Sequence, residues 1–300
     1  MQWSFCTKPI PFMNKTVSEI ELRHRTLRLP HGEDAPLIGS KQHYREELKK
    51  WQKKLLHVQQ AIYHQKKRAI VVFEGWDASG KGGAIRRLTG HLDPRGFAVH
   101  PIAAPTDEEQ GRHYLYRFQT RLPKPGRIAI FDRSWYGRVL VERVEQLTPD
   151  DAWQRAYREI NEFERMLSDD GVRIIKLFLH ISPDEQLRRF EERLHNPYKR
   201  WKLTEEDIRN RSKWSDYASA TEDMFDETDT RPAPWHLIQA EHKWYARVEV
   251  LKKVVKALRK GTDITPPPPD EKLIRLAEQK LGISVPDTDT PEPQQSEQDN

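Results

Sequence analysis

The chain is predicted to adopt an α/β fold in which helices cover both faces of a mainly parallel β-sheet. Two observations predict this fold. Five short runs of apolar, β-branched and aromatic residues alternate with stretches of helical periodicity, which is the pattern of consecutive βαβ units. The first run leads into residues 75–81, Gly-Trp-Asp-Ala-Ser-Gly-Lys, which match the G-x-x-x-x-G-K pattern of a phosphate-binding loop between a strand and a helix. We therefore expect a three-layer α/β/α P-loop fold with about five parallel strands.

The elements can be assigned in chain order. Residues 1–40 mix proline, glycine and charged residues without periodicity, so we expect an irregular arm. Apolar residues then recur at helical spacing from 41 to about 66, which predicts a long amphipathic helix. The five expected strands are residues 69–73, 97–102, 127–131, 173–181 and 235–239. Hydroxyl residues that precede acidic ones predict helix N-caps at Thr106, Thr148, Ser182 and Thr204.

The composition changes towards the carboxyl terminus. A last core helix is expected over residues 241–260, and Gly261 ends it. Four prolines at 266–269 form a stiff spacer, residues 270–281 have the pattern of a short helix, and the remainder has the composition of a disordered tail. We therefore predict an arm at 1–40, a core at 41–260 and a Pro-rich acidic tail at 261–300.

Charge and cysteine usage narrow the function classes. The chain has a net charge of +5, and residues 261–300, with three Lys/Arg and nine Asp/Glu, contribute −6, so residues 1–260 carry +11. A basic body indicates a polyanionic partner. The single cysteine excludes an internal disulfide framework and a cysteine-ligated zinc site. No run approaches the roughly 18 apolar residues that cross a bilayer, and the first residues lack a signal-peptide core. We therefore expect a cytoplasmic protein without a membrane partner.

The phosphate-loop pattern carries the first group of candidate site residues. Its glycines allow backbone N–H groups to surround phosphate oxygens, and Lys81 would reach the outer phosphates; these glycines are Gly75, Gly80, Gly82 and Gly83. The Ser or Thr that usually follows the lysine and holds magnesium is replaced by Gly82. A carboxylate, Asp77, stands inside the loop instead. Because an acid among phosphates is favourable only with a cation between them, we interpret Asp77 as a magnesium ligand. The alternative is that Asp77 caps its own loop.

A second acid follows the third apolar run. Asp132 ends the strand at 127–131, where phosphate-loop proteins place an acid that holds magnesium beside the loop. Asp77 and Asp132 could therefore bind the same metal ions, although Asp132 could instead cap the next helix. Arg133 is expected at the rim, where a guanidinium neutralises charge on a phosphoryl group in transfer, and Arg138 is a further candidate for phosphate binding.

The segment from about 186 to 214 is rich in basic residues and follows the fourth strand. Nucleotide kinases keep an arginine-bearing lid at this point, which closes over the phosphates and excludes water. The lid residues that we expect to bind phosphate are Arg193, Lys199, Arg200, Lys202 and Arg211. The alternative is a solvated basic helix face.

Several of these motifs together resemble the polyphosphate kinase 2 family. They are residues 74–83 (Glu-Gly-Trp-Asp-Ala-Ser-Gly-Lys-Gly-Gly), 92–96 (Leu-Asp-Pro-Arg-Gly), 131–144 (Phe-Asp-Arg-Ser-Trp-Tyr-Gly-Arg-Val-Leu-Val-Glu-Arg-Val), 193–214 and 231–235. The resemblance covers roughly residues 40–260. It implies a thymidylate-kinase-like P-loop kinase core, and it places the family's functional positions on Asp77, Lys81, Asp132, Arg133 and Arg193.

The resemblance also implies an activity and its partners. These are a phosphoryl transfer between inorganic polyphosphate and a nucleotide that depends on Mg²⁺, with Mn²⁺ as a second option, and assembly as a homodimer or homotetramer. Residues 135–144 look most like the subgroup that phosphorylates AMP to ADP, because the subgroup that uses ADP or GDP tends to have Asn where Gly137 stands.

Three alternatives stay open from the sequence. One is a nucleoside diphosphate, ADP or GDP, as the acceptor. Another is an ATP-dependent small-molecule kinase, which Gly82 and the surplus of basic residues disfavour. The last is a non-catalytic module that binds nucleic acid or another polyanion. It would leave Asp77 and Asp132 unexplained, and we expect no stable nucleic-acid partner.

Overall fold

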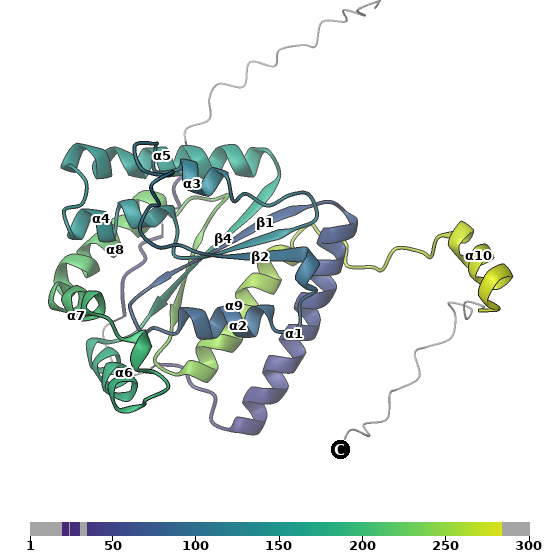
Figure 1. The fold of residues 1–300 in the computed structure, drawn as a ribbon, viewed down its shortest axis with the longest axis horizontal. Coiled ribbons are helices and arrows are strands. Elements are labelled where there is room, and N and C mark those ends of the chain that lie inside the picture. Colours follow the sequence, from purple (N-terminus) through teal and green to yellow (C-terminus); the bar gives the residue numbers. More distant parts are fainter. Residues whose placement is uncertain (1–19, 24, 31–34, 284–300) are drawn as a thin grey trace, which may run out of the picture. The chain divides into compact units, whose positions relative to one another are not determined.

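The computed structural model describes residues 20–23, 25–30 and 35–283. These residues contain a five-stranded, fully parallel sheet in the order β2-β3-β1-β4-β5, which confirms the predicted fold class (Figure 1). The strands are β1 (Arg68–Gly75), β2 (Phe97–Pro101), β3 (Ile128–Asp132), β4 (Val172–His180) and β5 (Trp235–Gln239). Each lies within two residues of its predicted range. Strands β1, β3 and β4 are buried on both faces and so produce continuous apolar runs, whereas the edge strands β2 and β5 are only partly buried.

Helices cover both faces of this sheet. The α-helices of the described chain are α1 (Lys41–His64), α2 (Lys81–Thr89), α3 (Tyr116–Gln119), α4 (Val141–Val144), α5 (Asp150–Asp169), α6 (Pro183–His195), α7 (Glu205–Ser212), α8 (Trp214–Thr228), α9 (Lys243–Arg259) and α10 (Glu271–Leu281). The described 3₁₀ turns are η1 (Pro94–Gly96), η2 (Trp135–Arg138) and η3 (Arg200–Lys202). Helices α1, α2 and α9 pack together on one face, whereas α4, α5 and α8 lie on the other (Figure 1).

Two of the four predicted N-caps are present. The Ser182 hydroxyl accepts a hydrogen bond from the Glu185 N–H at the start of α6, and Thr204 forms a capping box with Asp207 at the start of α7. No helix begins at Thr106, where the chain forms turns, and the N-cap of α5 is Pro149 rather than Thr148. The Thr148 pattern therefore preceded a helix without capping it, whereas the Thr106 pattern preceded none.

The described parts of the terminal segments differ in how they pack. Leu27 and Leu29 of the predicted arm are buried in the core, and Leu22 forms an isolated bridge with Thr230. Helix α10 belongs to a second compact unit that begins at Thr265. Predicted positions in 1–19 and 284–300 lie outside the described residues. No described helix combines the length and the apolar character that crossing a bilayer requires.

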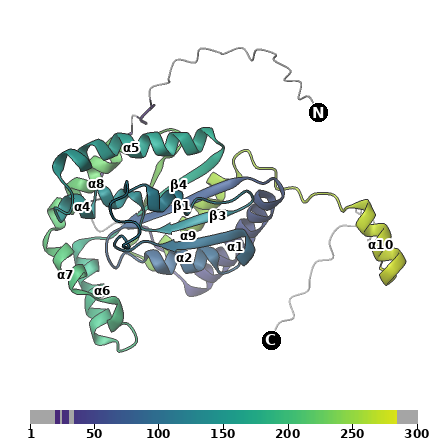
Figure 2. The same ribbon diagram turned by 45° about the horizontal axis from the view of Figure 1, so that its top comes forward.

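The sheet topology brings the two predicted acidic motifs to one edge. Strand β1 lies between β3 and β4, and Phe73 is paired with Asp132 in the parallel register. The loop after β1 and the residues after β3 therefore leave the same carboxyl edge, where open α/β sheets bind ligands. Helices α6 and α7 stand beside the layers in both views (Figure 2).

A buried ion pair between Lys176 of β4 and Glu164 of α5 joins the sheet to the helices that cover one of its faces. The Lys176 ammonium of β4 donates to the Glu164 carboxylate at 2.8 Å, to the Tyr136 hydroxyl at 2.7 Å and to the Thr228 carbonyl at 2.7 Å. The side chains of Lys176 and Glu164 are 0% and 1% exposed. Tyr136 belongs to η2, so this network helps to fix the turn that follows Asp132 and Arg133.

Removing one member of this pair should destabilise the fold strongly. We expect Lys176→Met to lower the free energy of unfolding by about 3–5 kcal/mol, because Glu164 would remain buried without its cation. Urea denaturation followed by circular dichroism measures this change. The double variant Lys176→Met/Glu164→Gln should recover part of the lost stability. A Lys176→Met variant as stable as the wild type would show that this ion pair does not stabilise the fold.

Candidate active site

The phosphate loop adopts a backbone that its glycines permit. Gly75 ends β1 at φ 135°, and a Cβ atom there would lie 2.3 Å from the Leu179 carbonyl oxygen of β4, so a side chain does not fit. Gly80 has φ 104° and is the N-cap of α2. The first helical bond here is donated by the Ala84 N–H to the Gly80 carbonyl, which leaves the N–H groups of the preceding turn without intrahelical acceptors. These groups and the positive end of the helix form an anion site.

Lys81 follows this loop and is folded back across it. Its ammonium donates to the carbonyl oxygens of Gly75 at 2.5 Å and Trp76 at 3.0 Å. Burial lowers the pKa of Lys81, while the neighbouring Asp77 opposes this effect. Among the described residues, no acid contacts the ammonium directly, so a phosphate oxygen could attract it away from the two neutral carbonyls.

Asp77 is held by two elements besides its own loop. Its Oδ1 accepts a hydrogen bond from Arg133 at 3.0 Å, and its Oδ2 accepts one from Asn210 of α7 at 2.9 Å. Burial would raise the pKa of Asp77, but the positive charges of Lys81 and Arg133 outweigh it and lower the pKa. Asp77 is therefore an ionised carboxylate between the loop and the lid.

Asp132 and Arg133 stand where β3 ends. No described residue donates a hydrogen bond to the Asp132 carboxylate, which lines the same cleft as Lys81. Arg133 has φ 66°, a left-handed conformation that is uncommon for a residue with a side chain, and its N–H donates to the Phe73 carbonyl at 3.0 Å. Strain of this kind is typical of functional sites, and here it turns the guanidinium towards Asp77.

A large cleft runs between the phosphate loop and the lid. It encloses about 760 Å³, and its described lining contains eight Lys/Arg against five Asp/Glu, which favours an anionic ligand. The basic residues are Lys81, Arg133, Arg189, Arg193, Lys199, Lys202, Lys243 and Arg247, and the acids are Asp77, Asp132, Glu192, Glu206 and Asp207. Gly80, Gly82 and Gly83 also line this cleft.

The lid contributes three of the predicted phosphate-binding residues to this cleft. Arg193 donates to the Lys202 carbonyl at 2.9 Å and lies 3.9 Å from Asp207. Lys199 forms an ion pair with Glu192. These contacts hold the cations at the wall of the cleft while leaving them accessible to a stronger anion.

The structure places three other predicted residues outside the described lining of this cleft. Arg138 forms an ion pair with Glu142 at 2.8 Å and covers the Tyr114 ring. Arg200 donates to the Leu194 carbonyl at 2.8 Å, and Arg211 donates to the Pro183 carbonyl at 2.7 Å. These three arginines form contacts within the protein, and phosphate binding by them stays a prediction.

A second, smaller cavity lies on the other side of Asp77. It encloses about 90 Å³ and shares Asp77, Arg133 and Glu206 with the cleft. The rings of Trp76 and Trp214 stack in its wall, with centroids 3.8 Å apart and planes 7° apart. Gly75 and Gly137 also line this cavity.

Sequence reasoning missed four residues of the site. Lys243 and Arg247 line the cleft from the start of α9, and their i, i+4 spacing directly after the last strand was a readable signal. No signal in the sequence pointed to Asn210, which contacts Asp77. Arg189 was visible only as part of a basic run, yet its side chain is 3% exposed.

The acids of the cleft suit a magnesium ion that is shared with a substrate. The described residues contain no cluster of three or more His, Cys, Asp or Glu that could hold a metal without help. Mg²⁺ usually binds through one or two carboxylates together with substrate phosphates and water. Asp132, with its carboxylate free of hydrogen-bond donors among the described residues, fits that pattern, and Asp77 fits it once Arg133 or Asn210 moves away.

Comparison with known proteins identifies relatives of the chain. A family model described as polyphosphate kinase 2 matches residues 39–265. The chain is 47% identical over 246 residues to a polyphosphate:AMP phosphotransferase from Pseudomonas syringae pv. tomato, which covers 82% of this chain and 49% of that protein. It is 39% identical over 229 residues to an ADP-polyphosphate phosphotransferase from Pseudomonas aeruginosa, which covers 76% of this chain and 75% of that protein.

The solved structures agree with this result. The crystal structure of polyphosphate kinase 2 from Arthrobacter aurescens TC1 has a TM-score of 0.75 and 31% sequence identity, and covers 86% of this chain and 98% of that one. The chain spans about half the length of the curated polyphosphate:AMP phosphotransferases that it matches.

Proposed function

Because the chain belongs to the polyphosphate kinase 2 family, we propose that it transfers a phosphoryl group from inorganic polyphosphate to AMP. The reaction forms ADP and leaves polyphosphate one unit shorter. The polyphosphate:AMP phosphotransferases among its relatives, at 45–48% identity, support AMP as the acceptor. Relatives at 37–39% identity are named for ADP or GDP, so a diphosphate acceptor is the second candidate.

One observation carries this proposal: the cleft and the smaller cavity meet at Asp77, Arg133 and Glu206. The long basic cleft suits polyphosphate, which carries about one negative charge per unit and needs a track of cations. The smaller cavity, with its stacked tryptophans, suits a nucleotide. A phosphoryl group that passes from one to the other would cross beside Asp77 and Arg133.

The chain's cations would do most of the chemistry. Phosphoryl transfer needs little covalent help from a protein, and catalysis is mainly positioning and charge neutralisation. Lys81 and the amides of the loop would hold the donor, Arg133 would face the group in transfer, and Arg193 would cover it from the lid. No side chain is required as a covalent intermediate.

Asp132 and Asp77 would hold Mg²⁺, or Mn²⁺ in its place. When bound, the metal would supply positive charge that offsets part of the charge of the phosphate groups. The negative charge of both carboxylates matters for that task, and the lowered pKa of Asp77 agrees with it.

The lid must move for the acceptor to bind. Sites for small molecules typically enclose about 300–1,000 Å³, whereas the smaller cavity encloses about 90 Å³. Asn210 of α7 and Trp214 of α8 line this cavity, so an outward shift of these helices would enlarge it and release Asp77 from Asn210. A homodimer or homotetramer and a cytoplasmic location stay predictions.

Acceptor assays test the proposal directly. The full chain is incubated with long-chain polyphosphate and Mg²⁺, and with AMP, ADP or GDP in separate reactions, and products are separated by anion-exchange chromatography. We expect ADP from AMP at the highest rate. ATP in place of polyphosphate is the control for an ATP-dependent kinase. Faster conversion of ADP or GDP would reassign the acceptor, and no product with any acceptor would refute the proposal.

A further inference from the structure

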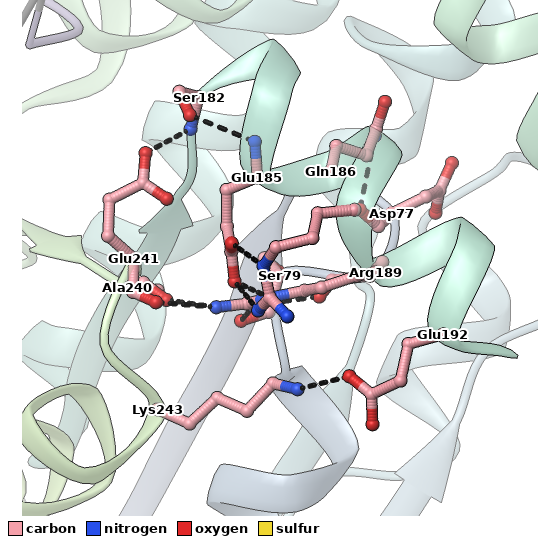
Figure 3. Close-up of polar contacts among 12 residues, drawn as sticks. Asp77, Ser79, Ser182, Glu185, Gln186, Arg189, Glu192, Ala240, Glu241 and Lys243 are labelled. Atoms are coloured by element: carbon pink, nitrogen blue, oxygen red, sulfur yellow. Dashed lines mark hydrogen bonds and ion pairs between the residues drawn. The ribbon is translucent and has the colours of Figure 1, made fainter.

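The phosphate loop is held by hydrogen bonds from one face of α6. Three successive carbonyl groups of the loop, those of Asp77, Ala78 and Ser79, accept hydrogen bonds from this helix. Gln186 donates to the first at 3.1 Å, and Arg189 donates to the other two at 2.9 Å each (Figure 3). The side chains of α6 thus satisfy all three of these carbonyls.

Arg189 uses its whole guanidinium in this arrangement. Its second amino group donates to the carbonyls of Ala240 at 2.6 Å and Glu241 at 2.9 Å, and its Nε donates to Glu185 at 2.5 Å. With the two loop carbonyls, these contacts occupy all five N–H donors that an arginine has. The buried side chain therefore joins the phosphate loop to the turn between β5 and α9 (Figure 3).

The segments that Arg189 joins also carry cations that line the cleft. The turn at 240–241 immediately precedes Lys243 and Arg247 in the first turns of α9. Arg193 lies four residues after Arg189 on α6 and so shares its face of the helix. The Arg189 guanidinium thus connects the loop to the two segments that carry the cations of the cleft, α6 with Arg193 and the start of α9.

We propose that Arg189 is a positioning residue for phosphate binding. It binds the carbonyls of the loop so that the amide N–H groups remain free for the donor, and it aligns the loop with Arg193, Lys243 and Arg247. This role rests on the proposed function, since it assumes that the cleft binds polyphosphate. A lysine at 189 would keep the charge, but its single ammonium could not span two pairs of carbonyls that lie on different segments.

The variant Arg189→Lys tests this role, with Arg188→Lys as its matched control. Arg188 is the adjacent residue, 59% exposed, and it shares Glu185 as its acceptor without contacting the loop. The probe is inorganic tripolyphosphate, with binding measured by isothermal titration calorimetry in the absence of nucleotide. We expect Arg189→Lys to weaken binding at least about tenfold, the effect of one charge-assisted hydrogen bond, and Arg188→Lys to change it less than twofold.

Steady-state kinetics separate positioning from a general loss of stability. Partial unfolding lowers the concentration of active enzyme and therefore kcat, but leaves the KM of the remaining molecules unchanged. We expect Arg189→Lys to raise the KM for polyphosphate about tenfold and to leave the KM for the nucleotide unchanged. Equal binding and equal KM values in both variants would overturn the inference. A wild-type chain that binds no tripolyphosphate would instead overturn the proposed function.

A measurement on the unaltered chain covers the case in which Arg189→Lys does not fold. Hydrogen–deuterium exchange is recorded with and without tripolyphosphate. We expect slower exchange in residues 77–84 and, in the same titration, in residues 185–193 and 240–247. Protection confined to the loop would show that Arg189 does not couple these segments.

Discussion

Replacing Lys81 with alanine is expected to reduce kcat by about 10²–10³-fold, the usual effect of removing one donor to developing charge. The ammonium now rests on the carbonyls of Gly75 and Trp76, inside a cleft lined by cations. In the loaded enzyme it would move to the donor phosphates, whose charge exceeds the attraction of two neutral carbonyls. Its loss should therefore appear mainly in turnover, as measured by ADP formation from AMP and polyphosphate.

Stability should be little affected by the same change. Lys81 forms no ion pair with an acid in the described structure, and its two hydrogen bonds go to carbonyls near the cleft surface. Lys81→Arg is the control for charge, because the guanidinium keeps the positive charge but differs from the ammonium in shape. We expect a thermal midpoint within a few degrees of the wild type for both variants. Wild-type turnover in Lys81→Ala would remove this lysine from the site.

The sequence was sufficient for the fold and for the backbone of the site. Continuous apolar runs marked all five strands, and the glycine pattern marked the loop that joins β1 to α2. The parallel order then placed Asp132 beside β1, through its register with Phe73. These features are local or follow from the rules of βαβ connection, which is why they can be predicted from one chain.

The lid was predictable only as a segment. Arg193 and Arg200 are seven residues apart in one basic run, but only Arg193 lines the cleft, because η3 follows α6 and changes the direction of the side chains. Arg189 and Asn210 depend on contacts with residues more than a hundred positions away, the loop at 77–79. Charge patterning cannot distinguish such a buried bridge from a solvated face.

The negative charge of Asp132 should be as important for turnover as the ammonium of Lys81. The variant Asp132→Asn removes this charge with almost no change in the shape of the side chain. The Asp132 carboxylate lies at the end of β3 in the wall of the cleft, and no described residue donates a hydrogen bond to it. We therefore expect the variant to fold like the wild type, which thermal melting can verify. If it holds Mg²⁺ against the donor phosphates, we expect turnover to fall by about 10³-fold, since the metal neutralises charge in the transition state.

The metal dependence of the remaining activity distinguishes this role from a merely electrostatic one. A weakened magnesium site should shift the Mg²⁺ concentration for half-maximal rate upwards, so turnover is measured from micromolar to millimolar Mg²⁺. Asp169→Asn, which removes an exposed carboxylate paired with Arg165 on α5, is the control and should match the wild type. An Asp132→Asn variant with normal turnover and an unshifted Mg²⁺ curve would remove Asp132 from the metal site and leave Asp77 as the remaining predicted ligand. The charge balance of the cleft argues against that outcome, because a single carboxylate that already accepts hydrogen bonds from Arg133 and Asn210 would have to displace both.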